Sequence, residues 1–211
     1  MDDCCAPHHD HDSSADRAYR RVLWIALGVN AAMFLVEIGA SLVAGSVSLQ
    51  ADALDFFGDA ANYAVGLSVL GLGVRWRART ALAKGAAMAA FALWVAGNTA
   101  WHAVAGEIPR ADLMSGIGAI ALAANLGVTI LLFRHRSGDS NRRSIWLCTR
   151  NDAIVNVAVI LAGGAVWLSG THWPDIAVAA VVAGLGLSSA WQIFRQAGAE
   201  LRGAEAAHEA N

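Results

Sequence analysis

Six long apolar segments, separated by short polar connections, dominate the hydrophobic pattern of the chain. Each segment has about 20 residues, the length that a helix needs to cross a hydrocarbon core of about 30 Å. The segments are 21–43, 52–74, 84–105, 112–133, 145–169 and 174–194. The pattern therefore predicts an all-α polytopic membrane protein with six transmembrane helices.

Short connections mark the expected ends of these helices. Residues 44–48 read as a tight loop between the first two spans. We expect Asp52, near the start of the second span, to be its N-cap, because an aspartate there accepts hydrogen bonds from free N–H groups. Pro174 is well placed to begin the sixth helix, since proline is tolerated in a first helical turn.

Basic residues fall almost entirely on one side of the predicted membrane. Fourteen of the fifteen Lys and Arg residues precede the first span, lie between the second and third, flank the fourth-to-fifth junction or follow the sixth. The exception is Arg110, between the third and fourth spans. Because cytoplasmic loops carry an excess of Lys and Arg, both termini are predicted to be cytoplasmic.

Composition supports a membrane protein and excludes several other classes. Hydrophobic residues make up 56% of the chain and charged residues 15%, whereas a soluble domain has about 25% charged residues. No basic domain is present, so nucleic-acid binding is not expected. We expect a disordered Cys/His-rich tail (1–18), a six-helix transmembrane domain (19–195) and a short cytoplasmic tail (196–211) that is too small to fold alone.

Two pairs of reactive side chains interrupt the apolar pattern at helical spacing. Asp55 and Asp59 lie four residues apart in the second span, and Cys148 and Asp152 repeat that spacing in the fifth. Residues at i and i+4 share one face of a helix. Ionisable groups at membrane depth usually face the bundle interior and mark an ion or proton path. The two pairs could therefore supply four ligands to one divalent metal ion.

A site of this kind would bind metal ions and protons in competition. Zinc takes four ligands from Cys, His, Asp and Glu, and pairs on neighbouring helices can converge on one ion. The ligands must be deprotonated, so proton uptake competes with metal binding. Simpler roles stay open for two of them: Cys148 as a small buried hydrophobic residue, and Asp152 as the partner of Arg150 near the interface.

Other polar residues are candidates for supporting roles. Asn62 and Asn156 each follow one of the two pairs by about one turn and could be hydrogen-bonding partners of the ligands. Glu37, in the first span, could carry a proton. The N-terminal tail could capture metal and deliver it to the site, although a solvated tail is an equal alternative. Its candidate ligands are Cys4, Cys5, His8, His9 and His11.

Three stretches resemble the cation diffusion facilitator family. Residues 44–59, with the sequence AGSVSLQADALDFFGD, resemble the second-helix motif of that family. Residues 152–160 (DAIVNVAVI) resemble its fifth helix, and residues 173–176 (WPDI) look like the start of its sixth. The resemblance covers about residues 20–195, and six spans with both termini inside agree with the topology of the family.

The resemblance implies a secondary transporter that exports Zn²⁺, or Cd²⁺ or Co²⁺, from the cytoplasm in exchange for protons. The metal is then the transported substrate, and no cofactor is expected. The family's four ligand positions fall on Asp55, Asp59, Cys148 and Asp152. The family usually works as a homodimer, so a homodimer in the lipid bilayer, in a bacterial inner membrane, is expected here.

Two departures from the family pattern change these expectations. Cys148 stands where His or Asp is usual, and a thiolate favours Zn²⁺ or Cd²⁺ over Mn²⁺ or Mg²⁺. The cytoplasmic domain that commonly follows the sixth helix is expected to be missing, which bears on dimerisation and regulation. The alternatives are a membrane metal sensor or accessory subunit that does not transport, and a membrane-embedded metalloenzyme. The enzyme is disfavoured because no span carries a nucleophile or His-Glu-x-x-His motif.

Overall fold

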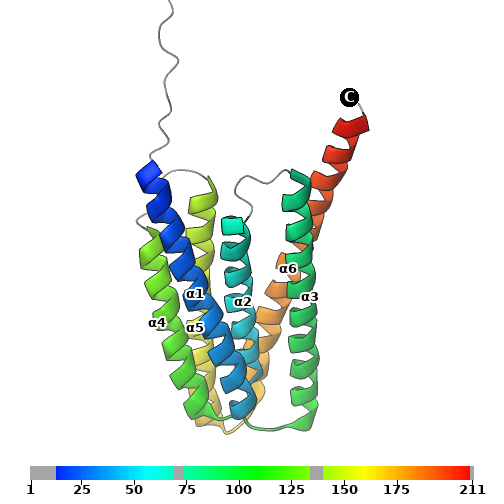
Figure 1. Ribbon diagram of the computed structural model, residues 1–211. Coiled ribbons are helices and arrows are strands. Elements are labelled where there is room, and N and C mark those ends of the chain that lie inside the picture. The colour runs from blue at the N-terminus through cyan, green and yellow to red at the C-terminus, as the bar shows by residue number, and fades with distance from the viewer. Residues whose placement is uncertain (1–12, 69–73, 134–139, 210–211) are drawn as a thin grey trace, which may run out of the picture.

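The computed structural model describes the backbone of residues 13–68, 74–133 and 140–209. These residues form six α-helices and no β-strand, and the helices run alongside one another as one bundle (Figure 1). The helices are α1 (Ser13–Ala44), α2 (Val47–Ser68), α3 (Val74–Ala105), α4 (Ala111–Phe133), α5 (Ser140–Ser169) and α6 (Trp173–Glu209). The start of α1 and the end of α6 lie at the same end of the bundle.

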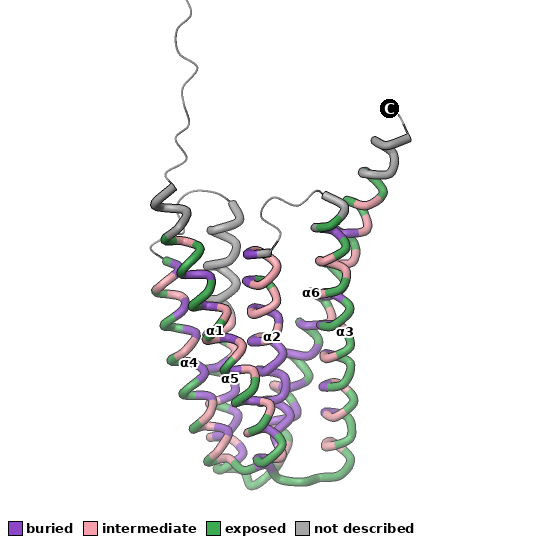
Figure 2. The backbone as a smooth tube through the Cα atoms, in the orientation of Figure 1, coloured by how far each residue is buried: buried purple, intermediate pink, exposed green. Residues whose placement is uncertain are grey.

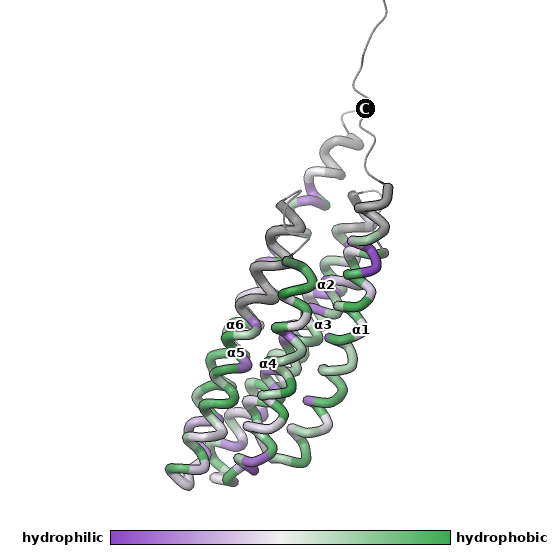
Figure 3. Tube along the Cα trace, turned by 90° about the vertical axis from the view of Figure 1, so that its left-hand side faces the viewer, coloured by the Kyte–Doolittle hydropathy of each residue, from purple (hydrophilic) through white to green (hydrophobic). Residues whose placement is uncertain are grey.

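The surface of the bundle is apolar along the length of the helices. Figure 3 shows long hydrophobic stretches that are interrupted by isolated hydrophilic positions. Large apolar side chains such as Val104, Trp167 and Leu168 are exposed, which a water-soluble monomer would not tolerate over so wide an area. In lipid the same surface is favourable, since helices satisfy their own backbone hydrogen bonds. The predicted all-α polytopic membrane fold is therefore confirmed.

Helix α2 differs from the other five because it is polar and buried. The helices α1, α3, α4, α5 and α6 are long and apolar enough to cross a membrane. Helix α2 has the necessary length, but three aspartates reduce its hydrophobicity. It packs against α1, α3, α5 and α6, and residues 47–54 at its start are all buried (Figure 2). Its neighbours thus shield its carboxyl groups from lipid.

The start of α2 lies five residues before the sequence prediction because another helix caps it. The Asp175 carboxylate, from the first turn of α6, accepts hydrogen bonds from Ser46 Oγ (2.7 Å) and from the backbone N–H groups of Val47 (2.9 Å) and Ser48 (3.0 Å). Gly45, with φ 64°, makes the turn that separates α1 from α2. The prediction that Asp52 is the N-cap is wrong, because Asp52 lies in the second turn and is fully buried.

Four other helices also extend beyond the predicted spans. Helices α1 and α5 begin at Ser13 and Ser140, eight and five residues before the predicted first and fifth spans, so residues 13–18 are helical and not part of a disordered tail. Helix α3 begins at Val74, ten residues before the predicted third span. Helix α6 continues past residue 194 to Glu209, through a segment rich in alanine and glutamate, which favour helices. The extensions of α3 and α6 carry arginines, so they are polar continuations of apolar spans.

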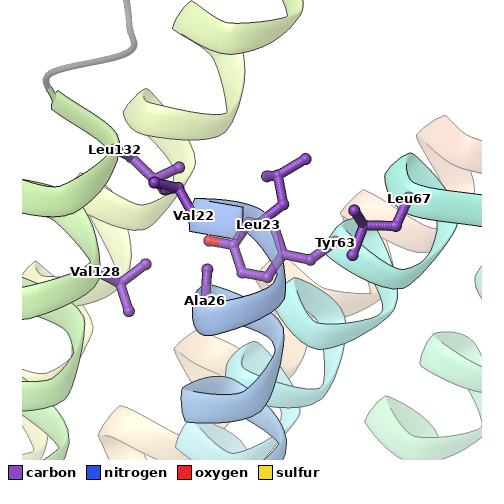
Figure 4. Packing of buried hydrophobic residues seen from close by; sticks show 7 residues of the cluster. All are labelled: Val22, Leu23, Ala26, Tyr63, Leu67, Val128 and Leu132. Atoms are coloured by element: carbon purple, nitrogen blue, oxygen red, sulfur yellow. The ribbon is translucent and has the colours of Figure 1, made fainter. Parts of the chain in front are cut away.

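A hydrophobic cluster fixes α2 against α1 and α4 at the end of the bundle where α1 begins. Its buried members come from all three helices (Figure 4) and are Val22, Leu23, Ala26, Tyr63, Leu67, Val128 and Leu132. The Tyr63 ring reaches from α2 towards α1 in this cluster. Because the ring is held by packing, its hydroxyl group has a defined position beside the acidic face of α2.

Candidate metal centre

The acidic face of α2 carries Asp52, Asp55 and Asp59. Spacings of three and four residues place all three on one side of the helix. Asp52 and Asp59 are buried and Asp55 is half-buried. Each of the three interacts electrostatically with at least one other. A row of carboxyl groups inside an apolar bundle is costly unless protons or cations neutralise it.

Asp59 links this face to α5. Its Oδ2 accepts a hydrogen bond of 3.1 Å from the Tyr63 hydroxyl group. The Asp152 carboxyl group of α5 interacts with Asp59, and it also feels the charge of Asp55. Asp152 Oδ2 is buried and has no hydrogen-bond donor among the described residues. The structure thus brings three of the four predicted ligands into one neighbourhood.

These carboxyl groups do not form a closed ligand set in this conformation. Within the part of the chain that the structure describes, no three His, Cys, Asp or Glu side chains converge tightly enough to hold a metal ion. Cys148 lies in α5, four residues before Asp152, but its side chain is outside the described residues. The same holds for the whole N-terminal group Cys4, Cys5, His8, His9 and His11.

A lysine approaches the acidic face from α3. Lys84 Nζ donates a hydrogen bond to Asn62 Oδ1, and its charge also acts on Asp59. Asn62 in turn interacts with Asp59. From the sequence, this lysine was counted only among the basic residues between the second and third spans, and its contact with the acidic face was not predicted. The early start of α3 places Lys84 about three turns inside that helix.

A second polar group lies beside the aspartates and crosses four helices. Asn125 Nδ2 of α4 donates to Asn156 Oδ1 of α5 at 2.8 Å. Asn156 Nδ2 donates to both carboxylate oxygens of Asp52, at 2.7 and 2.8 Å. Asp52 also interacts electrostatically with Glu37 of α1. Asn156 therefore contacts Asp52, whereas the sequence analysis had assigned it to the ligand pair on its own helix.

The opposite end of the bundle carries polar contacts of another kind. Asn98 Nδ2 of α3 donates to Gln50 Oε1 of α2 at 2.9 Å, and Asp175 caps α2 as described above. The sequence analysis missed Asp175, although it noted the preceding Pro174. An acidic residue directly after a proline at a helix start was the available signal.

The fold and its acidic interior define an integral, multi-pass membrane protein with ionisable groups inside its helical bundle. The family model described as the cation efflux transmembrane domain matches residues 23–202. Since this match covers most of the chain, the protein belongs to the cation efflux, or cation diffusion facilitator, family. No curated protein matches it. Members of the family transport metal cations and do not form an enzyme class. The resemblance stated from the sequence is confirmed.

Proposed function

We propose that this efflux protein exports a divalent cation, foremost Zn²⁺, from the cytoplasm in exchange for protons. The metal site consists of Asp55 and Asp59 of α2 with Cys148 and Asp152 of α5. The observation that carries this proposal is the interaction between Asp59 and Asp152, a buried and a half-buried carboxyl group from different helices.

The charge of the site favours a divalent cation. Three carboxylates and a thiolate exceed the charge of one such ion, so the site attracts a metal strongly when it is deprotonated. Cd²⁺ and Co²⁺ are the other candidates, and the thiol disfavours hard ions such as Mg²⁺. Without metal, neighbouring carboxyl groups can be neutralised by protons, so metal and protons displace each other.

The direction of transport follows from the distribution of basic residues. Exposed Arg20 of α1, Arg79 of α3 and Arg195 of α6 belong to segments at or near the end of the bundle where the termini lie. The excess of basic residues on that side supports a cytoplasmic assignment. The bilayer is then a bacterial inner membrane, and the protein acts as a homodimer, with the N-terminal Cys and His residues capturing metal.

Asn62, Glu37, Asp52 and Asn156 have supporting roles in this proposal. Asn62 connects Lys84 to Asp59. Asn156 holds Asp52 through two hydrogen bonds. A metal sensor that binds but does not transport is the competing function, and flux separates the two.

Metal flux into vesicles tests the proposal. Purified protein in liposomes with an acidic interior should accumulate Zn²⁺ as protons leave. Asp59→Asn and Asp152→Asn should each abolish accumulation, whereas Asp112→Asn, an exposed change in the first turn of α4, should leave it unchanged. Circular dichroism and size-exclusion chromatography check that every variant is folded. Undiminished flux in either of the two site variants would reject the site, and Zn²⁺ binding without flux in the wild type would favour the sensor.

A further inference from the structure

Glu37 of α1 is an acid with no visible partner for its charge. The side chain is 0% exposed, and neither Oε1 nor Oε2 has a hydrogen-bond donor among the described residues. An ionised carboxylate in such a position would lose its hydration without any compensation. Buried polar groups are almost always hydrogen-bonded. Glu37 is therefore expected to be a neutral carboxylic acid in this conformation.

The neighbour that can accept its proton is Asp52. The two carboxyl groups interact electrostatically across the contact between α1 and α2. Asp52 already accepts two hydrogen bonds from Asn156 Nδ2. The carboxylate fixes the orientation of the Asn156 amide, since the amide oxygen would be repelled. Asn156 Oδ1 then accepts from Asn125. In this series of hydrogen bonds, both amide donors point towards Asp52. Asp52 is therefore the ionised member of the Glu37–Asp52 pair, and Glu37 holds the proton.

The other ionisable groups around this pair are mainly acidic. From α2, both Asp52 and Asp55 act on Glu37. Helix α4, which also packs on α1, contributes no ionisable residue beyond Asp112 in its first turn. Asp52 itself also faces Asp152 of α5. Among the other helices on α2, α3 brings Lys84 next to Asp59 and α6 brings Asp175 to the first turn.

We propose that Glu37 carries a counter-transported proton. It holds this proton beside Asp52 and away from the metal ligands. This inference rests on the proposed function. When a divalent cation binds at Asp55, Asp59 and Asp152, its positive charge offsets the acidic groups that kept the proton on Glu37. The O–H bond of Glu37 then breaks, its electron pair stays on the carboxylate, and the proton passes to water. When the metal leaves, Glu37 takes up a proton again.

The separation of the two sites gives the exchange a physical basis. Protons that sit on the ligands themselves must leave before the metal can bind. A proton on Glu37 responds only to the charge of the bound metal, through Asp52 and Asp55. Glu37 is thus a coupling residue, and its loss should change the number of protons exchanged more than the ability to bind metal.

Glu37→Gln tests this because glutamine imitates the protonated acid in shape and, like it, carries a hydrogen-bond donor, but has no acidic proton to release. Zn²⁺ is titrated into the purified full chain in weakly buffered solution while a pH indicator records proton release. We expect the variant to bind Zn²⁺ and to release about one proton fewer per metal ion than the wild type. The pH dependence of log Kd for Zn²⁺ should become less steep by about one. Glu107→Gln, in an exposed loop, is the matched control.

Glu37→Asp distinguishes coupling from packing, because it keeps the acid and shortens the side chain. Proton release should be retained in that variant. Infrared difference spectra of the wild type provide a test that needs no variant: Zn²⁺ binding should remove a protonated carboxyl band. The inference is overturned if that band does not change, or if Glu37→Gln releases protons and responds to pH as the wild type does. Absence of Zn²⁺ flux in the wild type would instead defeat the proposed function.

Discussion

Glu37 and Asp175 are equally buried acids with opposite surroundings. Asp175 is 1% exposed and accepts three hydrogen bonds from Ser46, Val47 and Ser48. Glu37 is 0% exposed and accepts none from the described residues. A buried carboxylate surrounded by donors is stable as an ion and can serve as a structural connection. One without donors is stable only when a proton or a metal ion neutralises it, so it can respond to both.

The same contrast separates two regions of the bundle. Around Asp175 the acid joins α6 to the start of α2, and the nearby Gln50–Asn98 pair joins α2 to α3. Around Asp59, acids from α2 and α5 interact with one another, and Asp152 Oδ2 has no donor among the described residues. The first region should therefore determine stability and the second should determine transport.

The largest expected effect comes from Asp59→Asn. The change preserves shape but removes one charge from the metal site and weakens the link to Asp152. Zn²⁺ flux should fall to background, at least a hundredfold. Stability should not fall, because removing a charge from a crowded group of buried carboxyl groups relieves repulsion. Thermal melting in detergent, measured beside vesicle flux, checks both parts. A melting temperature that fell together with the flux would remove the distinction between the two regions.

Asp175→Ala should give the reverse result. Three donors near the start of α2 would lose their acceptor in a buried position, and each such loss costs about 1–3 kcal/mol. Allowing for partial relaxation, we expect a loss of about 2–5 kcal/mol in stability, with Asp175→Asn milder. Zn²⁺ affinity per folded molecule should stay within about threefold, a change of less than about 0.7 kcal/mol. Isothermal titration on the folded fraction measures it, and a large loss of affinity would make Asp175 part of the site.

The local pattern of the sequence predicted the fold and the pairs of reactive side chains at i, i+4 spacing. The features that it did not predict depend on contacts between distant segments. The apolar periodicity predicted the spans, and the i, i+4 spacing singled out Asp55 and Asp59. The early start of α2 was not predictable because its cap, Asp175, lies 129 residues from Ser46 in sequence. The pairing of Glu37 with Asp52 also joins two helices, and no periodicity within either helix specifies which side chains meet.

Lys84 shows the same limit and offers a smaller test of the acidic region. Its positive charge acts on Asp59 and opposes the approach of a cation. Lys84→Gln should therefore tighten Zn²⁺ binding by about tenfold, or about 1.4 kcal/mol, at constant pH. Lys84→Arg keeps the charge and should bind Zn²⁺ nearly as the wild type does. Calorimetric titration of Zn²⁺ into the wild type and the two variants shows whether the affinity rises or falls. Weaker binding by Lys84→Gln would mean that the lysine orients Asn62 and Asp59 more than it competes with metal.

The smallest effect is expected from a carboxylate that is neither buried nor without a partner. Arg110 Nη2 lies 3.0 Å from Asp112 Oδ2, and both side chains are more than half exposed. The hydrogen bond from Arg110 lowers the pKa of Asp112 below its ordinary value. Arg110→Gln should raise that pKa towards the ordinary value, which NMR titration of the Asp112 carboxyl carbon can follow.

The lowered pKa of Asp112 also determines how its contribution to stability changes with pH. Because the pKa of Asp112 is lowered in the folded protein, the ionised carboxylate adds a little stability at pH values above the unfolded pKa. That stability is lost as the pH falls through the folded pKa. Exposed ion pairs contribute little, so melting and Zn²⁺ flux at neutral pH should match the wild type. If Arg110→Gln reduced Zn²⁺ flux by a factor as large as the expected change in Zn²⁺ affinity of Lys84→Gln, burial and missing donors would no longer explain which acids are needed for transport. The contrast between Glu37 and Asp175 would then have to rest on their positions in the bundle alone.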